Sequence, residues 1–319
     1  MKRFLLECVL VALSFIIINI LLFQFAKKDY NTYLNAYNNK IELLEKTSKP
    51  RLIFVGGSNL AFGIDSKIIK DSLNMNVINM GLHAGIGIKY ILQDCYQYVS
   101  ENDIVILQME YSNFFNGGDG SAETLQGLMA ATNWRNFWKL NLHQQFIIGM
   151  GVIQQSYSNL NKLLSSTKQK DTRGTKSKVY RYVADGFNEY GDEESHWYLE
   201  SDNPKIDENK VENNGQIDPG FVNWLQKTLK RFEEKGVIVI LLPPVTINSY
   251  FDSVYSESIN DCISHIGYQY VVEPREMVLA DSCYYNAVYH VNREGVIQNT
   301  SKIISILKDN IHMSEKNNM

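Results

Sequence analysis

From Arg51 to Leu60 the chain reads RLIFVGGSNL, a short apolar run that leads directly into two glycines, a serine and an asparagine. An apolar run of this length, followed by a glycine-rich turn and an amphipathic helix, is typical of a buried strand in a parallel sheet. The residue after such a turn lies at the carboxyl edge of the sheet, where open α/β folds bind their ligands. Ser58 is that residue, although Gly57-Ser58-Asn59 would also suit a simple polar turn.

Strand and helix patterns alternate beyond this segment. The expected strands cover residues 52–55, 77–80, 104–109, 237–242 and 268–272. The expected helices lie near residues 66–73, 87–99, 221–235 and 253–266, with a last helix that ends near residue 307. This alternation predicts an α/β domain over residues 51–312, with a parallel sheet and helices on both faces. The long aromatic and polar segment at about 114–219 interrupts the pattern, and we interpret it as an insertion that covers the site as a lid.

The amino terminus predicts a membrane anchor. Residues 4–26 are mostly apolar, and as a helix they would reach roughly 34 Å, enough to cross a bilayer core of about 30 Å. The apolar part is longer than that of a secretory signal peptide. We therefore expect an uncleaved transmembrane signal anchor at residues 1–28, a helical stalk at 29–50 and a polar tail at 313–319. The domain would then be extracytoplasmic on a single-pass protein of the cell membrane.

Length and charge limit the function classes. The chain has 319 residues, enough for one sizeable domain and an appendage. Its net charge of -4 and the absence of a basic stripe argue against nucleic acid as a partner. The four cysteines are Cys8, Cys95, Cys262 and Cys283, and their spacing indicates neither a disulfide framework nor a zinc site.

A second motif lies near the carboxyl terminus, where Tyr289-His290-Val291-Asn292 precedes Glu294-Gly295 and the last predicted helix. A serine after the first strand and a histidine before the last helix resemble the SGNH/GDSL hydrolase superfamily, in its membrane-anchored branch that modifies envelope polymers. Gly57-Ser58-Asn59-Leu60 is similar to the first block of that family. The resemblance implies a flavodoxin-like three-layer domain. It also implies a serine esterase or O-acyltransferase for acyl esters, acetyl esters above all, of cell-envelope glycans.

The resemblance implies that Ser58 is the nucleophile and that His290 takes and returns the proton. The family carries an aspartate four residues before the histidine, and this chain has Asn286 there. An asparagine can accept a hydrogen bond from the imidazole but lacks the charge that stabilises the imidazolium. Either the enzyme works as a weak dyad, or a different carboxylate supplies the charge. Asp281 is the nearest acid on the amino-terminal side, although it also suits a turn.

An acyl-transfer site needs donors for the developing oxyanion. The resemblance assigns the backbone amides of Ser58 and Gly81 to this role, with Asn113 as a third donor displaced by about one position. Glu110 stands where the family has a glycine, so it would order the loop or contact the substrate. The expected substrate contacts are Asn59, Glu110, Tyr111 and Tyr289. The segment from Gly186 to Asp192, followed by His196 and Trp197, is interpreted as part of the lid.

The expected partners are an acylated glycan or another ester substrate, the membrane through the amino-terminal helix, and a membrane-bound acyl-transfer protein. No metal or organic cofactor is implied. Hydrolysis and transfer stay open, because the choice depends on whether water or a sugar hydroxyl reaches the acyl-enzyme. An alternative is a catalytically weakened binding or scaffold subunit of an envelope glycan assembly, which Asn286 favours. A nucleotide-binding domain is disfavoured, because no P-loop lysine and no Gly-x-Gly-x-x-Gly follows the first strand.

Overall fold

A four-stranded parallel sheet forms the centre of the computed structural model, which describes residues 2–25, 33–132, 134, 137–164, 182–203 and 216–317. Its strands are β1 (Arg51–Gly56), β2 (Asn76–Asn79), β3 (Ile104–Gln108) and β4 (Ile238–Leu241), in the order β2-β1-β3-β4. This order places β1 between β2 and β3 and is compatible with a flavodoxin-like sheet. The predicted α/β class with a parallel sheet is confirmed.

The fifth predicted strand is reduced to a single bridge. Tyr270 pairs with Leu241 as an isolated parallel bridge, and the amide of Val271 donates to the Leu241 carbonyl at 3.1 Å. Two short strands, β5 (Thr246–Ile247) and β6 (Val278–Leu279), form a separate parallel pair.

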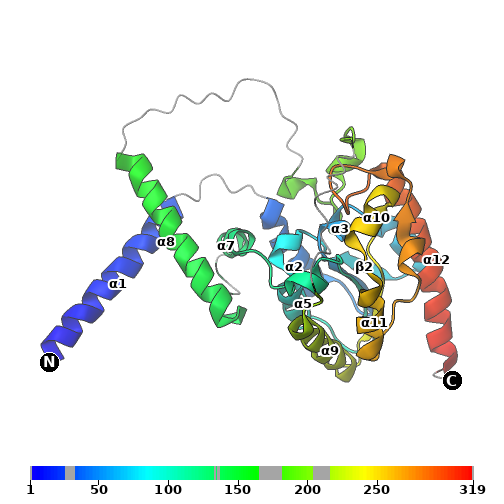
Figure 1. The fold of residues 1–319 in the computed structure, drawn as a ribbon, viewed down its shortest axis with the longest axis horizontal. Helices are drawn as coiled ribbons and strands as arrows, with labels where there is room; N and C mark the ends of the chain where they lie inside the picture. The colour runs from blue at the N-terminus through cyan, green and yellow to red at the C-terminus, as the bar shows by residue number, and fades with distance from the viewer. Residues whose placement is uncertain are drawn as a thin grey trace.

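Helices cover both faces of the sheet, because alternate residues of each strand point to opposite sides. On one face Leu52 and Phe54 pack in a core with residues of α4 (Ser66–Leu73) and α12 (Arg293–Asn317). On the other face Ile53 and Val55 pack with α5 (Ile88–Cys95), α9 (Pro219–Glu234) and α11 (Glu257–His265). Figure 1 shows α12 on one side of the sheet and α5, α9 and α11 on the other.

Several helices differ in extent from the prediction. The helix expected near 253–266 is divided into α10 (Asn248–Val254) and α11, because Tyr255 and Ser256 are both extended. Helix α12 continues to Asn317, so it includes most of the expected polar tail at 313–319.

The predicted stalk is instead part of the domain. A turn of 3-10 helix, η2 (Tyr33–Asn35), leads into α2 (Ala36–Lys46). Tyr37, Ile41 and Leu44 are buried in the same core as Ile53 and Val55, and the Tyr37 hydroxyl donates to Asp94 at 3.0 Å. The predicted helical spacing is present, and the apolar face of this helix packs against the sheet.

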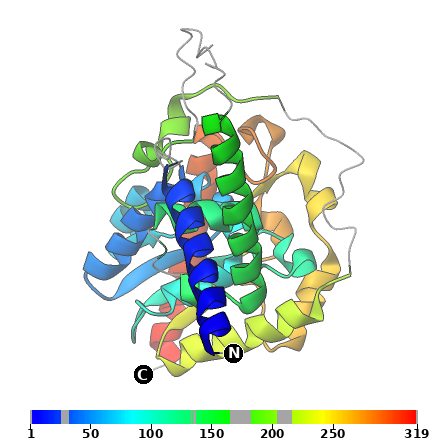
Figure 2. The same cartoon turned by 90° about the vertical axis from the view of Figure 1, so that its left-hand side faces the viewer.

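The amino-terminal helix α1 (Lys2–Phe25) packs against α8 (Leu142–Leu164). The Ser156 hydroxyl of α8 donates to the Asn19 carbonyl of α1 at 2.9 Å. Both helices lie apart from the sheet in Figure 1 and run in front of it in Figure 2. Within the described ranges, no helix is both long enough and apolar enough to span a membrane. The predicted transmembrane helix is therefore not found, and Lys2, Arg3 and Glu7 place charges in its first two turns.

Part of the insertion packs into the α/β domain. It contains α6 (Asn113–Asn116), α7 (Ala122–Ala131), η4 (Phe137–Lys139), α8, η5 (Ala184–Gly186) and η6 (Ser195–Tyr198). Residues 165–181 and 204–215 of the predicted insertion lie outside the described residues. Asp192, Glu193 and His196 are buried, so the segment expected to form part of a lid is packed into the domain instead.

Candidate active site

Three neighbouring strands end at the same edge of the sheet, and each is followed by a residue of the predicted site. In the parallel register Gly56 of β1 is paired with Gln108 of β3. Ser58 and Glu110 each lie two residues beyond this pair, so the register brings them together. Gly81 follows β2 on the other side of β1. The carboxyl edge therefore gathers these residues as the sequence predicts.

Ser58 is the first residue of the short helix α3 (Ser58–Ala61). Its hydroxyl donates to Glu110 Oε1 at 3.1 Å, and the amide of Asn59 donates to the same oxygen at 3.3 Å. A Cβ at Gly57 would lie 2.6 Å from Glu110 Oε1, so a larger residue there would force this carboxylate to move. The hydroxyl of Ser58, the candidate nucleophile, is thus hydrogen-bonded directly to a carboxylate.

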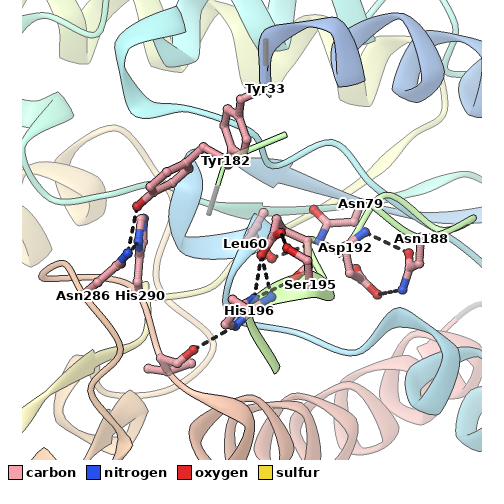
Figure 3. A network of polar contacts seen from close by, with 12 residues as sticks. Tyr33, Leu60, Asn79, Tyr182, Asn188, Asp192, Ser195, His196, Asn286 and His290 are labelled. Atoms are coloured by element: carbon pink, nitrogen blue, oxygen red, sulfur yellow. Dashed lines mark hydrogen bonds and ion pairs between the residues drawn. The ribbon is translucent and has the colours of Figure 1, made fainter. Parts of the chain in front are cut away.

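His290 lies beside Asn286. Its Nδ1 is 2.7 Å from Asn286 Oδ1, and Asn286 Nδ2 donates to the Tyr182 hydroxyl at 3.0 Å (Figure 3). An amide oxygen can only accept, so Nδ1 carries the proton and Nε2 is the basic nitrogen of a neutral ring. Asn286 therefore orients the imidazole as an aspartate would, without supplying a charge.

Phe62 connects the histidine to the helix that carries Ser58. The Phe62 amide donates to the Ser58 carbonyl at 3.0 Å, so the two residues lie one helical turn apart on the same side. The Phe62 ring stacks on the imidazole of His290. In the described part of the chain no hydrogen bond joins Ser58 and His290, because the serine hydroxyl donates to Glu110 instead.

Burial keeps the histidine uncharged. His290 is 7% exposed, and burial lowers its pKa from the usual value to about 3, with further lowering by the charges of His196 and His83. A site of this kind favours the neutral imidazole and resists formation of an imidazolium.

The three predicted oxyanion donors differ in their availability. The Gly81 amide donates to Asn79 Oδ1 at 2.8 Å, and Asn113 Nδ2 donates to the Glu110 carbonyl at 2.8 Å. The Ser58 amide has no hydrogen bond to another described residue. Ser58 is therefore the donor that is ready for an oxyanion, while the other two would have to exchange existing bonds.

Three of the expected substrate contacts are structural residues. Asn59 is buried, accepts from the Gly57 amide at 3.0 Å and donates to the Gln108 carbonyl at 3.0 Å, so it closes the turn between the strands. Tyr111 and Tyr289 are buried in the core. Burial also raises the pKa of the Tyr111 hydroxyl. Of the four residues, Glu110 is the one whose side chain accepts a hydrogen bond from the Ser58 hydroxyl in the described structure. The acid at Asp281 is also accounted for, since it accepts from the Ser249 amide at 2.9 Å.

A buried polar network supports β2 and the loop after it. The sequence motifs did not indicate this network. Asp192 accepts from the Ser66 amide at 2.8 Å, from the Ser66 hydroxyl at 2.6 Å and from Asn79 Nδ2 at 2.8 Å. Asn188 also donates to it at 3.2 Å (Figure 3). Burial raises the pKa of the Asp192 carboxyl, and these hydrogen bonds oppose the shift. The same Asn79 side chain holds the Gly81 amide, so this network positions a predicted oxyanion residue.

His196 supports the histidine loop from the other side. Its Nδ1 lies 2.8 Å from Glu193 Oε2, and its Nε2 lies 3.1 Å from the carbonyl of Val291, the residue after His290. Its ring also packs 4.8 Å from that of Phe62. In the sequence, the unusual segment from Gly186 to Trp197 pointed to His196 and its neighbours. It did not indicate which residues they contact.

Across the described residues, no three or more histidine, cysteine, aspartate or glutamate side chains are grouped so as to hold a metal ion. Comparisons with protein-family models, with curated proteins and with solved structures found no match to this chain.

Proposed function

We propose that this protein is an SGNH-type serine esterase or O-acyltransferase that acts on acyl esters, acetyl esters above all, of cell-envelope glycans. In this proposal Ser58 attacks the ester carbonyl and carries the acyl group, and His290 is its partner in proton transfer. Water as the acceptor gives an esterase, and a sugar hydroxyl gives an acyltransferase. The flavodoxin-like SGNH fold and an extracytoplasmic location at the envelope belong to the same proposal, as does a membrane-bound acyl-transfer protein as a partner.

The observation that carries the proposal is that Phe62 links Ser58 and His290: its amide donates to the Ser58 carbonyl, and its ring stacks on the imidazole. Ser58 begins a helix at the carboxyl edge of the sheet. His290 stacks on Phe62 one turn away, with Nδ1 held by Asn286 so that Nε2 is the basic nitrogen. A serine, an oriented imidazole and a backbone donor are the groups that acyl transfer requires.

The experiment is covalent labelling of the full-length protein with a fluorophosphonate probe that reacts with activated serines. Wild type is expected to be labelled, and Ser58→Ala is expected to lose the label completely. Ser249→Ala is a matched control, because the Ser249 hydroxyl also donates to a carboxylate, that of Asp281, outside the proposed site. Release of acetate from acetylated envelope glycan, lost in Ser58→Ala, would then establish the substrate class.

No labelling of a folded wild type would overturn the proposal, as would a label that persists in Ser58→Ala. A binding or scaffold role would then take its place. Two observations favour that alternative: Asn286 brings no charge to His290, and no hydrogen bond joins Ser58 to His290 in the described residues.

A further inference from the structure

The carboxylate of Glu110 accepts a hydrogen bond from the Ser58 hydroxyl, which the proposed reaction must deprotonate. Glu110 Oε1 lies 3.1 Å from Ser58 Oγ, within the range of a productive proton transfer. The amide of Asn59 donates to the same oxygen at 3.3 Å and so fixes its position. Glu110 is only 5% exposed. The register of the parallel strands therefore holds both residues of this contact in place.

The histidine side of the site is built for a neutral ring. Asn286 offers His290 an amide oxygen rather than a carboxylate, and Phe62 covers one face of the imidazole. Forming an imidazolium there would place a new charge in a buried position without a counter-charge, which is unfavourable. The carboxylate that the SGNH pattern places at residue 286 is absent, and a carboxylate that the pattern lacks is present at residue 110.

We propose that Glu110 is the catalytic base that accepts the Ser58 proton when the acyl-enzyme forms. This inference rests on the proposed function, in which Ser58 is the nucleophile, and it gives the proton transfer with Ser58 to Glu110 in place of His290. His290 then acts in the second half of the reaction, where neutral Nε2 accepts a hydrogen bond from the water or sugar hydroxyl that attacks the acyl-enzyme and orients it.

The steps balance in protons and electron pairs. Ser58 Oγ forms a bond to the ester carbonyl carbon, its proton moves to Glu110 Oε1, and the carbonyl π pair moves onto the oxygen. The intermediate collapses, the bond to the alcohol oxygen breaks, and the leaving alcohol takes the proton from Glu110. In the second half the acceptor oxygen bonds to the acyl carbon, its proton moves to Glu110 Oε1, and the carbonyl π pair moves onto the oxygen. The bond between the acyl carbon and Ser58 Oγ then breaks, and Ser58 Oγ recovers the proton from Glu110.

Charge considerations support this division. When Glu110 accepts the proton, its negative charge disappears as the oxyanion appears, so the buried site never holds two adjacent anions. Transfer to His290 in the first step would instead leave the ionised Glu110 beside the new oxyanion, and like charges at that distance are costly. The Ser58 amide is the donor that is then available to the oxyanion.

The test measures the rate of fluorophosphonate labelling, which reports only the attack by Ser58. Glu110→Gln retains an oxygen that can accept from the Asn59 amide but cannot take a proton at neutral pH, so its labelling rate should fall by about 100-fold or more. Glu110→Asp should retain more activity than Glu110→Gln. Glu123→Gln, an exposed carboxylate on α7, is the matched control and should label at the wild-type rate. His290→Gln should slow turnover of a p-nitrophenyl ester more than it slows labelling.

A pH profile separates a base from a merely structural residue. The titratable side chains near this edge include Tyr33, Tyr182, His83, Glu193, His196 and His290. Tyr33 interacts with Glu110, and its pKa is raised by burial first and then by Glu193, Tyr182 and Glu110. The rate of wild-type labelling should fall as the pH drops and Glu110 takes a proton, and this fall should be absent in Glu110→Gln.

Labelling of Glu110→Gln at the wild-type rate, or faster, would overturn the inference and leave the proposed function standing. A faster rate would mean that the carboxylate blocks the donors of the site. A wild type that is folded but never labelled would overturn both the inference and the proposed function.

Discussion

Phe62 and His290 stack with their ring centroids 4.1 Å apart and their planes inclined by 11°. The stack covers one face of the imidazole and leaves His290 with little exposure to water. Because a charged imidazolium would lose its hydration there, burial is the largest cause of the low pKa of this residue, about 3. The contact that positions the histidine is therefore also the contact that keeps it neutral.

The first prediction concerns stability in acid. The pKa of His290 is lower in the folded state, about 3, than in the unfolded state, where it is about 6.5. Between these values the unfolded chain binds more protons, so the stability from the neutral ring is present above pH 6.5 and is lost as the pH falls toward 3. From pH 7 to pH 4 this group should cost about 3 kcal/mol of unfolding free energy, at 1.36 kcal/mol per pH unit.

Urea unfolding of wild type and His290→Phe at pH 7 and pH 4 measures this loss. The variant keeps an aromatic ring on Phe62 and should lose about 3 kcal/mol less than wild type over the same interval. His143→Phe, an exposed histidine of α8, is the control and should behave as wild type. Equal losses in wild type and His290→Phe would contradict the prediction.

The second prediction concerns the missing charge at residue 286. In Asn286→Asp a carboxylate would replace the amide oxygen that lies 2.7 Å from His290 Nδ1. A negative charge at that distance favours the imidazolium, so the pKa of His290 should rise by about 1–3 units. An NMR titration of the His290 ring protons measures the shift, and ester turnover should increase with it.

Asn292→Asp is the control for this experiment. Asn292 lies two residues after His290, and its oxygen accepts from the Gly295 amide at 3.1 Å. An aspartate can make the same contact, so this variant changes the charge of the loop without facing Nδ1. If His290 titrates in the same way in Asn286→Asp and in wild type, residue 286 does not control the pKa of the imidazole.

The third prediction concerns the buried cation of α2. Lys40 donates to the carbonyls of Asn79, at 2.9 Å, and Gly191. Burial lowers the pKa of Lys40 to about 7, and the charge of Asp192 opposes this shift. Lys40→Met would remove the cation near the buried Asp192 carboxylate and leave both carbonyls without this donor. We expect a loss of about 3 kcal/mol in unfolding free energy, since breaking a buried pair leaves an uncompensated charge.

Equilibrium unfolding in urea measures this loss against Lys67→Met. Lys67 also pairs with a carboxylate, that of Asp71 at 2.8 Å, but its side chain is 65% exposed. An exposed pair contributes little, so the control should be nearly as stable as wild type. The prediction is wrong if the two variants are equally stable.

Helices, strands and motifs that are determined by residues close together in the sequence could be predicted. Helix α4 spans Ser66–Leu73 as expected, because Asp65 caps it by accepting from the Ile68 amide and its apolar residues recur at helical spacing. Strand β1 follows from an apolar run that ends in glycines. Ser58 and His290 were likewise found as candidates from the motifs around them, since each motif is contained within a few residues.

Placement of the elements could not be predicted in the same way. The spacing of Tyr33, Tyr37, Ile41 and Leu44 indicated one apolar helical face, but spacing does not say what that face covers. In the structure it covers the sheet, so the expected stalk is core. The buried Asp192 was equally hidden, because its hydrogen bonds reach Ser66, which is 126 residues away in the chain.

The sequence alone therefore determined the class of the fold and the two motifs at the edge of the sheet, because periodicity and turn chemistry are local properties. Only the tertiary structure decided which side chain holds the Ser58 hydroxyl. The pairing of Gly56 with Gln108 sets Ser58 beside Glu110 across 52 residues of chain, and the packing of Phe62 against His290 decides the charge of the imidazole. Strand register and burial are long-range results of folding, so local patterns in the sequence do not reveal them.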